Sequence, residues 1–234
     1  MKSKTAVVIG ANGGIGSAFA TLLEGETEYS NVIRFSRADD SPIKLDVEQE
    51  ETISEAALWL KESGITPSLV LIATGLLCAN GQTPEKSISD LNGDWLIENY
   101  RINAVGPALI AKHFLPLMAQ EDLIKFAAIS ARVGSISDNR TGGWYGYRAA
   151  KTALNMIVRN LSIEWQRKNK RSVIVALHPG TVDTRLSAPF QRNVPNEKLF
   201  DSERAALQLL DVLDDLKPSD SGKIFAWNGD EIQP

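Results

Sequence analysis

The chain has very few of the residues that staple small proteins or hold metal ions. Its 234 residues include one cysteine, Cys78, and two histidines, His113 and His178. A single cysteine excludes an intramolecular disulfide, and the histidines are too far apart in sequence for a usual ligand spacing. We therefore expect no metal site, and a protein of a reducing compartment, the cytoplasm.

Basic charge and long hydrophobic runs are scarce as well. The chain carries 25 Lys and Arg against 29 Asp and Glu, whereas proteins that bind nucleic-acid backbones are normally basic. The apolar run at residues 5–9 is too short for a signal peptide. The longest apolar stretch, residues 105–119, contains Lys112, His113 and Pro116 and does not suit a bilayer span. We expect neither nucleic acid nor a membrane as a partner.

Short β-branched runs alternate with helical patterns along the chain. The sequence predicts strands at 6–9, 32–35, 69–73, 125–130, 173–177 and 223–227, and helices at 15–24, 48–63, 94–118, 144–168 and 202–216. Apolar strands in this order are typical of a parallel sheet covered by helices on both faces. The prediction is an α/β, doubly wound, Rossmann-type fold that forms one domain over residues 1–234. The irregular stretch 180–201 is interpreted as a functional loop.

A glycine-rich turn joins the first predicted strand to the first predicted helix. Residues 10–16 read GANGGIG, with glycines at 10, 13, 14 and 16. Such a turn lets the backbone approach a pyrophosphate, and the helix N-terminus offers it free N–H groups. The spacing differs from the common G-x-G-x-x-G, and a glycine turn also suits a strand-to-helix connection without a ligand. Its position at the first crossover of an α/β chain favours a dinucleotide site.

The end of the second predicted strand indicates which dinucleotide is bound. An acidic residue about 20 residues beyond the turn would bind the ribose 2′-hydroxyl of NAD. Here the chain reads Phe35-Ser36-Arg37. Arg37, with Arg34 as a second candidate, is suited to pair with a 2′-phosphate, which predicts NADP(H). The alternatives are that Arg37 is a solvated surface charge, or that the nearby Asp39 and Asp40 weaken the preference.

A tyrosine and a lysine lie four residues apart at the start of the long helix predicted at 144–168. Tyr147 and Lys151 therefore share one helix face. A free tyrosine, with a pKa of about 10, is a poor acid or base at neutral pH. A nearby ammonium lowers that pKa, which makes the pair a candidate proton donor and acceptor for a carbonyl or alcohol oxygen. An exposed helical pair without chemistry is the alternative.

Taken together, these motifs resemble the short-chain dehydrogenase/reductase superfamily over nearly the whole chain. The resemblance is carried by Gly10, Gly14, Gly16, Leu45-Asp46-Val47, Ala73-Thr74-Gly75, Asn103, Tyr147, Lys151 and residues 179–184 (PGTVDT). Residues 130–135, 142–145 and 225–227 look like the C-factor and Sniffer carbonyl-reductase branch. The resemblance implies a sheet of about seven strands and a homodimer or homotetramer formed through the helices around 94–118 and 144–168.

The resemblance also implies a role for each matching residue. Tyr147 would protonate a carbonyl oxygen as hydride arrives from the cofactor, Lys151 would bind the nicotinamide ribose, and Asn103 would hold a water in a proton relay to Lys151. The implied cofactor contacts are Gly10, Asn12, Gly14, Ile15, Gly16, Arg37, Asp46, Val47, Ala73, Gly75, Pro179, Val182 and Thr184, besides Tyr147 and Lys151. Ala73-Thr74-Gly75 stands where the family usually has Asn-Ala-Gly, after its fourth strand.

One departure from the family pattern affects the catalytic serine. That serine usually lies three residues before a glycine, but Ala131 lies three residues before Gly134. Ser130 is one residue early, and on a strand a shift of one residue turns the side chain to the other face. Three alternatives stay open: Ser130 assists catalysis, Ser135 folds back to do so, or no serine takes part.

Two hypotheses about function follow. In the first, the chain is an enzyme that reduces an aldehyde or ketone with NADPH, or runs the reverse reaction. In the second, it is a dinucleotide-binding signalling or sensor protein with little turnover, which Ala131 and the C-factor resemblance favour. The presence of Asn103, Tyr147 and Lys151 favours the enzyme. Residues 185–200 and the aromatic residues Trp144 and Tyr145 are expected to determine the substrate.

Overall fold

The structure is a computed structural model that describes residues 4–38, 40–79 and 81–234. Its main sheet contains six parallel strands in the order β2-β1-β3-β4-β5-β8. These are β1 (Lys4–Ile9), β2 (Tyr29–Phe35), β3 (Leu69–Ile72), β4 (Ile124–Ile129), β5 (Ser172–His178) and β8 (Ile224–Ala226). The strand order reverses beside β1, as the doubly wound prediction requires, and this is where such sheets bind ligands.

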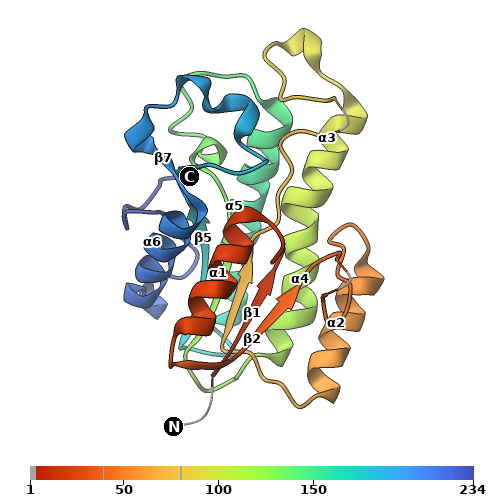
Figure 1. Ribbon diagram of the computed structural model, residues 1–234, viewed down its shortest axis with the longest axis vertical. Coiled ribbons are helices and arrows are strands. Elements are labelled where there is room, and N and C mark those ends of the chain that lie inside the picture. Colours follow the sequence, from red (N-terminus) through yellow and green to blue (C-terminus); the bar gives the residue numbers. More distant parts are fainter. Residues whose placement is uncertain (1–3, 39, 80) are drawn as a thin grey trace.

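Helices cover both faces of this sheet (Figure 1). The α1 (Gly14–Gly25) and α6 (Ser202–Asp215) helices pack on one face, against a cluster that includes Ala6 and Val8. The other face packs against α2 (Glu50–Glu62), α4 (Gly106–Phe114) and α5 (Tyr145–Trp165), in a cluster that includes Val7 and Ile9. Alternate residues of one strand thus enter opposite cores, which explains why the strands are apolar throughout.

All six strands predicted from the sequence are present in this sheet, which has six strands among the described residues where about seven were expected. After β2 the chain forms an isolated bridge between Ser36 and Lys44. Two further short strands, β6 (Thr181–Val182) and β7 (Leu199–Phe200), pair with each other outside the main sheet. They close the base of the irregular stretch 180–201, which also contains the 3₁₀ turns Ala188–Asn193 and Asn196–Lys198.

The helix predicted at 94–118 is interrupted. It consists of α3 (Gly93–Tyr100), a π-helical turn (Arg101–Val105), α4 and a 3₁₀ turn (Leu115–Leu117). Gly106 allows α4 to approach the preceding loop, because a Cβ at this position would lie 2.8 Å from Val47 Cβ. The π turn contains Asn103, and π turns inside helices are frequent at functional sites. No helix in the described part of the chain is long and apolar enough to cross a membrane.

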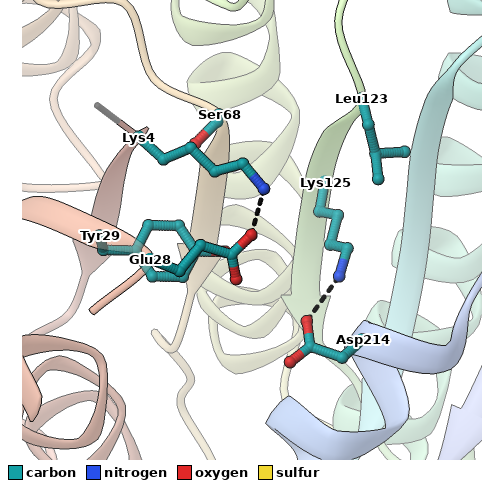
Figure 2. A pocket seen from close by; sticks show the side chains of 7 residues that line it. All are labelled: Lys4, Glu28, Tyr29, Ser68, Leu123, Lys125 and Asp214. Atoms are coloured by element: carbon teal, nitrogen blue, oxygen red, sulfur yellow. Dashed lines mark hydrogen bonds and ion pairs between the residues drawn. The ribbon is translucent and has the colours of Figure 1, made fainter. Parts of the chain in front are cut away.

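A hollow of about 260 Å³ opens where the strands begin, at the edge opposite the carboxyl ends (Figure 2). Two ion pairs line it, one between Lys4 and Glu28 and one between Lys125 and Asp214. In Figure 2 each ammonium points toward its own carboxylate, so the charges of the hollow neutralise each other. The phosphates of a dinucleotide need unpaired donors, which these two ammonium groups, each held by a carboxylate, do not offer.

Candidate dinucleotide and catalytic site

The glycine-rich turn folds tightly between β1 and α1. Gly10 has a φ of +82°, and its N–H donates to Phe35 O at 2.9 Å. At Gly16 a Cβ would lie only 2.2 Å from Gly10 O, so no other residue fits there without moving the backbone. Gly10 and Gly16 are therefore required by the turn itself, which brings the start of α1 next to the carboxyl end of β1.

The first turn of α1 is open to an anion. The helix begins at Gly14, its N-cap residue Gly13 offers no side-chain acceptor, and its first turn has no acidic residue. The first N–H groups of α1 have no partners within the helix, and the positive end of the helix dipole lies at the same terminus. A Cβ at Gly14 would lie 2.8 Å from both Thr184 Cγ2 and Ser202 Oγ. Thr184 was expected here, whereas Ser202 was missed because it follows the irregular stretch.

The two arginines considered for a 2′-phosphate differ in their surroundings. Arg34 donates twice to the Glu24 carboxylate, at 2.8 Å each, and once to Thr21 Oγ1 at 3.2 Å. This pairing with Glu24 and Thr21 argues against Arg34 as the second candidate for the 2′-phosphate. Arg37 is exposed, and no hydrogen bond or ion pair joins it to the described residues. Asp39 lies outside the described residues.

Four more of the expected cofactor contacts are Asn12, Ile15, Asp46 and Val47. Asn12 is exposed, and its side-chain amide donates to Asp40 Oδ1 at 3.5 Å. Asp46 is half-buried, and its Oδ1 accepts from Glu48 N at 3.1 Å. Val47 is buried against α4 and Ile15 is half-buried at the start of α1. These contacts leave the side chains of Asn12 and Asp46 near the surface.

Residues 73–75 follow β3, the third strand along the chain, where the resemblance implied a fourth. Ala73 N donates to Ile9 O at 2.8 Å and so continues the pairing of β3 with β1. The next residue, Thr74, has a buried Oγ1 with no hydrogen-bond partner among the described residues. Its methyl group would lie 2.9 Å from a Cβ at Gly10. A buried polar atom without a partner beside a glycine cradle is what a site for a polar ligand should contain.

Tyr147 and Lys151 lie in the first turns of α5. Both are buried, with exposed fractions of 9% and 2%. Lys151 Nζ donates to Ile129 O at 2.8 Å and lies 5.6 Å from the centroid of the Tyr147 ring. The predicted i,i+4 pair is therefore formed, and its ammonium is also attached to the carboxyl end of β4.

Burial changes the proton affinity of both groups. It raises the pKa of the Tyr147 phenol above its ordinary value and lowers the pKa of Lys151 to about 7. The sequence predicts that the lysine lowers the tyrosine pKa, but removal from water is the larger effect on the pKa of this buried phenol. Tyr147 therefore keeps its proton at neutral pH, as a proton donor must.

Asn103 reaches the same place from the π turn. Its Oδ1 accepts from Leu76 N at 3.0 Å, and its Nδ2 donates to Leu76 O at 2.8 Å. A Cβ at Gly75 would lie 3.4 Å from Asn103 Oδ1 and 3.9 Å from Lys151 Nζ. Asn103, Lys151 and the loop after β3 thus meet at Gly75, although three separate segments contribute them.

The two serines considered for catalysis are hydrogen-bonded inside the fold. Ser130 Oγ donates to Asn155 Oδ1 at 2.7 Å, and Ser135 Oγ donates to Gln233 O at 2.5 Å. Both residues are only 2% exposed. This packing argues against the expected catalytic role of Ser130 and against the alternative role of Ser135. Ala131, which is partly exposed just beyond β4, occupies the family's serine position.

An aromatic wall stands beside Tyr147. The Trp144 ring lies 6.2 Å from the Tyr147 ring and 4.9 Å from that of Phe190. Phe190 belongs to the irregular stretch, so this stretch folds back over the start of α5. Sequence reasoning predicted Trp144 and the stretch, but not Phe190, because no periodicity marks which loop residue turns inward. Tyr145 is exposed.

The base of the irregular stretch follows β5. Pro179 is buried, Val182 is 4% exposed, and Val182 packs with Phe200 and Ala205. Gly180 has a φ of +76°, and a Cβ there would lie 2.9 Å from the Phe200 ring. The chain between β5 and Thr184 is thereby fixed beside α1. The described residues contain no group of histidine, cysteine and acidic side chains that could hold a metal ion.

Comparisons with known proteins agree with the resemblance found in the sequence. A family model described as enoyl-(acyl carrier protein) reductase matches residues 10–212. The C-signal protein of Myxococcus xanthus is 35% identical over 159 residues, 68% of this chain and 86% of that protein. The 1-hydroxy-2-glutathionyl-2-methyl-3-butene dehydrogenase of Rhodococcus sp. strain AD45 is 29% identical, over 98% of this chain and 99% of that protein. The NADPH-bound carbonyl reductase from chicken fatty liver superposes with a TM-score of 0.86 and 26% identity, over all of both chains.

Proposed function

The chain belongs to the short-chain dehydrogenase/reductase family of oxidoreductases, and from that premise we propose that it reduces an aldehyde or ketone with NADPH, or oxidises the corresponding alcohol. The observation that carries the proposal is the meeting of Tyr147, Lys151 and Asn103 at the carboxyl edge of the sheet, beside Gly75. A nicotinamide dinucleotide bound at this edge supplies or accepts the hydride.

The residues of the glycine-rich turn fit the dinucleotide. The open N-terminus of α1 would hold its pyrophosphate, with Thr184 and Ser202 beside it. Thr74 Oγ1 and Lys151 Nζ are the polar groups available to the ribose nearer the reaction. Gly75 leaves room there, since a side chain would approach both Asn103 and Lys151.

Tyr147 moves the proton. Its phenol is protonated at neutral pH and would donate to the carbonyl oxygen as that oxygen gains negative charge. Lys151, attached to Ile129 O, would keep a positive charge near the resulting phenolate and return a proton to it. Asn103 fixes the backbone at Leu76 and would hold the water that reaches Lys151. No serine hydroxyl takes part, so Tyr147 is the one side-chain donor to the substrate oxygen.

NADP(H) is the proposed cofactor. Arg37 follows β2 and is exposed, and the residue before it, Ser36, carries no charge that would repel a phosphate. A guanidinium pairs with a phosphate through two parallel hydrogen bonds. The chicken carbonyl reductase, which is similar over the whole chain, holds NADPH in its crystal structure.

The aromatic wall favours an apolar carbonyl compound. The Trp144 ring lies beside Tyr147 and the Phe190 ring packs on Trp144, so both rings would offer apolar contact to a substrate that approaches the phenol. Apolar surface buried against such rings contributes about 25 cal/mol per Å² to binding. The substrate class we propose is therefore an aldehyde or ketone with a hydrophobic substituent.

A second candidate function has its own observation. Ala131 leaves the substrate oxygen without the family's usual second donor, and the C-signal protein is a relative. A dinucleotide-binding signalling protein or sensor with little turnover would be compatible with both facts. Against it, such a protein has no chemical need for a buried Tyr147 and Lys151 in register with Asn103.

We also propose that the chain forms a homodimer or homotetramer. Large apolar side chains are exposed on the outer faces of α3 (Ile97, Tyr100) and α5 (Met156, Ile163). Exposed apolar side chains on neighbouring helices are typical of subunit contacts. Sedimentation of the wild-type chain and of Ile97→Glu would test this face.

The test of the proposed function is a fluorescence titration with NADPH and, separately, NADH, followed by a panel of apolar aldehydes and ketones. We expect tighter binding of NADPH and its oxidation by members of the panel. Tight binding without turnover on any carbonyl would favour the sensor. Failure to bind either dinucleotide would contradict both functions.

A further inference from the structure

A buried glutamate lies at the start of the helix that carries Tyr147. Glu85 belongs to the loop between β3 and α3 and is 3% exposed. Its main-chain carbonyl accepts from Trp144 N at 2.5 Å, and its carboxylate Oε2 accepts from Gly146 N at 3.2 Å. Because α5 begins at Tyr145, these two hydrogen bonds lie on either side of its first residue.

The start of α5 needs such a contact, because it has no cap of its own. The residue before the helix is Trp144, and its side chain accepts no hydrogen bond from the helix. The first N–H groups of a helix have no partners within it, and Gly146 N is one of these. A carboxylate at this end also meets the positive end of the helix dipole. Glu85 thus does from a distant loop what Ser or Asp does at an ordinary N-cap.

Trp144 adopts a backbone conformation that has to be held in place. Its φ is 52°, and no other described residue except glycine has a positive φ. A left-handed conformation at a non-glycine residue costs about 1–3 kcal/mol and persists only where surrounding contacts fix it. The bond to Glu85 O and the packing of the Trp144 ring on Phe190 are such contacts. Arg148 Nε donates a hydrogen bond to the preceding carbonyl, Gly143 O, at 3.1 Å.

The Glu85 side chain is not explained by stability alone. Its second carboxylate oxygen, Oε1, is buried without a hydrogen-bond partner among the described residues. A buried polar atom without a partner destabilises a fold. The absence of a side chain at Gly146 leaves room for this oxygen, because a Cβ there would lie 3.0 Å from it and 3.5 Å from Asn99 Cγ.

We infer that Glu85 is a positioning residue for the reaction: it fixes Trp144 and the first turn of α5, and through them the Tyr147 phenol. The inference rests on the proposed function, in which that phenol must meet a carbonyl oxygen at hydrogen-bond distance. A displacement of about 1 Å at such a site lowers a rate by up to about 10²-fold. Glu85 acts through the backbone of α5 and takes no part in the proton transfer itself.

The experiment compares Glu85→Ala with Glu85→Gln, which retains an acceptor oxygen at the same reach. The control is Asp90→Ala, in the same loop, whose carboxylate caps Lys86 N and Ser87 N at 3.1 and 3.0 Å and leaves α5 alone. We expect kcat to fall about 10- to 100-fold in Glu85→Ala, with KM and the NADPH dissociation constant changed less than about threefold. Glu85→Gln should recover most of kcat, and Asp90→Ala should resemble wild type.

Hydrogen exchange at residues 144–147 provides a second readout that needs no turnover. We expect faster exchange in Glu85→Ala alone, and it decides the inference even if wild-type protein reduces no carbonyl and the proposed function fails. If Glu85→Ala does not fold, Glu85→Asp replaces it, because the shorter side chain keeps the charge but loses the reach to Gly146 N. Unchanged kcat and exchange in Glu85→Ala or its substitute, or a Gln variant as impaired as these, would overturn the inference.

Discussion

Lys151 Nζ donates a hydrogen bond to the main-chain carbonyl of Ile129 at 2.8 Å, so that one buried side chain joins α5 to the end of β4. The same burial lowers the pKa of this lysine from its ordinary 10.5 to about 7. The folded and unfolded chains therefore hold different numbers of protons between these two pH values, and the stability of the cofactor-free protein should depend on pH in a way that is specific to this residue.

The sign of that dependence follows from linkage. Above pH 7 the folded chain releases the Lys151 proton while the unfolded chain keeps its own, so the free energy of unfolding rises with pH. Between pH 7 and 8.5 the rise due to Lys151 should be about 1.5 kcal/mol. The free energies of unfolding of wild type and Lys151→Met, measured with denaturant, should therefore converge as the pH rises. The comparison is made below the pH range where tyrosines titrate. Parallel curves of stability against pH for the two proteins would contradict the lowered pKa of Lys151.

Replacing Tyr147 with phenylalanine should separate chemistry from binding. Removal of the one proposed proton donor should lower kcat for carbonyl reduction by about 10²- to 10⁴-fold. NADPH affinity, measured by cofactor fluorescence, should change little, because the ring and its packing on Trp144 remain. Tyr145→Phe is the matched control, since it removes an exposed hydroxyl from the same helix. Retained turnover in Tyr147→Phe would remove the tyrosine from the mechanism.

Arg37 and Arg34 provide a matched pair for cofactor choice. Arg37→Ala should weaken NADPH binding by about 10- to 100-fold and leave NADH binding nearly unchanged, because a charge-assisted pair with the 2′-phosphate is lost. Arg34→Ala removes the same charge nearby, but Arg34 is engaged with Glu24. We expect it to lower stability slightly without changing the NADPH-to-NADH ratio. Equal effects of the two variants would show a general charge effect and no specific phosphate site.

Features of the fold and site that depend on residues close together in sequence could be predicted, whereas contacts between distant segments could not. The tight turn at Gly10 to Gly16 and the i,i+4 pair of Tyr147 and Lys151 are set by a few neighbouring residues, and the structure confirms their geometry. The six strands of the main sheet were likewise predicted from their local apolar runs. The engagement of Arg34 by Glu24 and the inward turn of Phe190 depend instead on packing between distant segments. No local pattern encodes these, and Glu85 was missed for the same reason.

Ala131→Ser tests the departure from the family pattern. A hydroxyl just beyond β4 should supply the substrate oxygen with a second donor and raise kcat by about 10-fold or more, since one such donor is worth about 10²–10³ in related oxyanion sites. Ser130→Ala is the comparison. It removes the bond to Asn155 Oδ1 and should lower stability by about 1 kcal/mol with kcat unchanged. A large fall in kcat for Ser130→Ala would restore Ser130 to the mechanism.

Phe190→Ala tests the aromatic wall as the determinant of substrate choice. The Phe190 ring packs on Trp144 at 4.9 Å, and its loss opens the side of the site that faces the irregular stretch. We expect KM for hydrophobic aldehydes and ketones to rise about 10-fold, because the contact area lost is apolar. KM for a small carbonyl such as acetaldehyde, which cannot reach the ring, should stay within about twofold of wild type. Steady-state kinetics over a homologous series of aldehydes measures this difference, and an equal rise in KM across the series would mean that Phe190 supports the loop and does not contact the substrate.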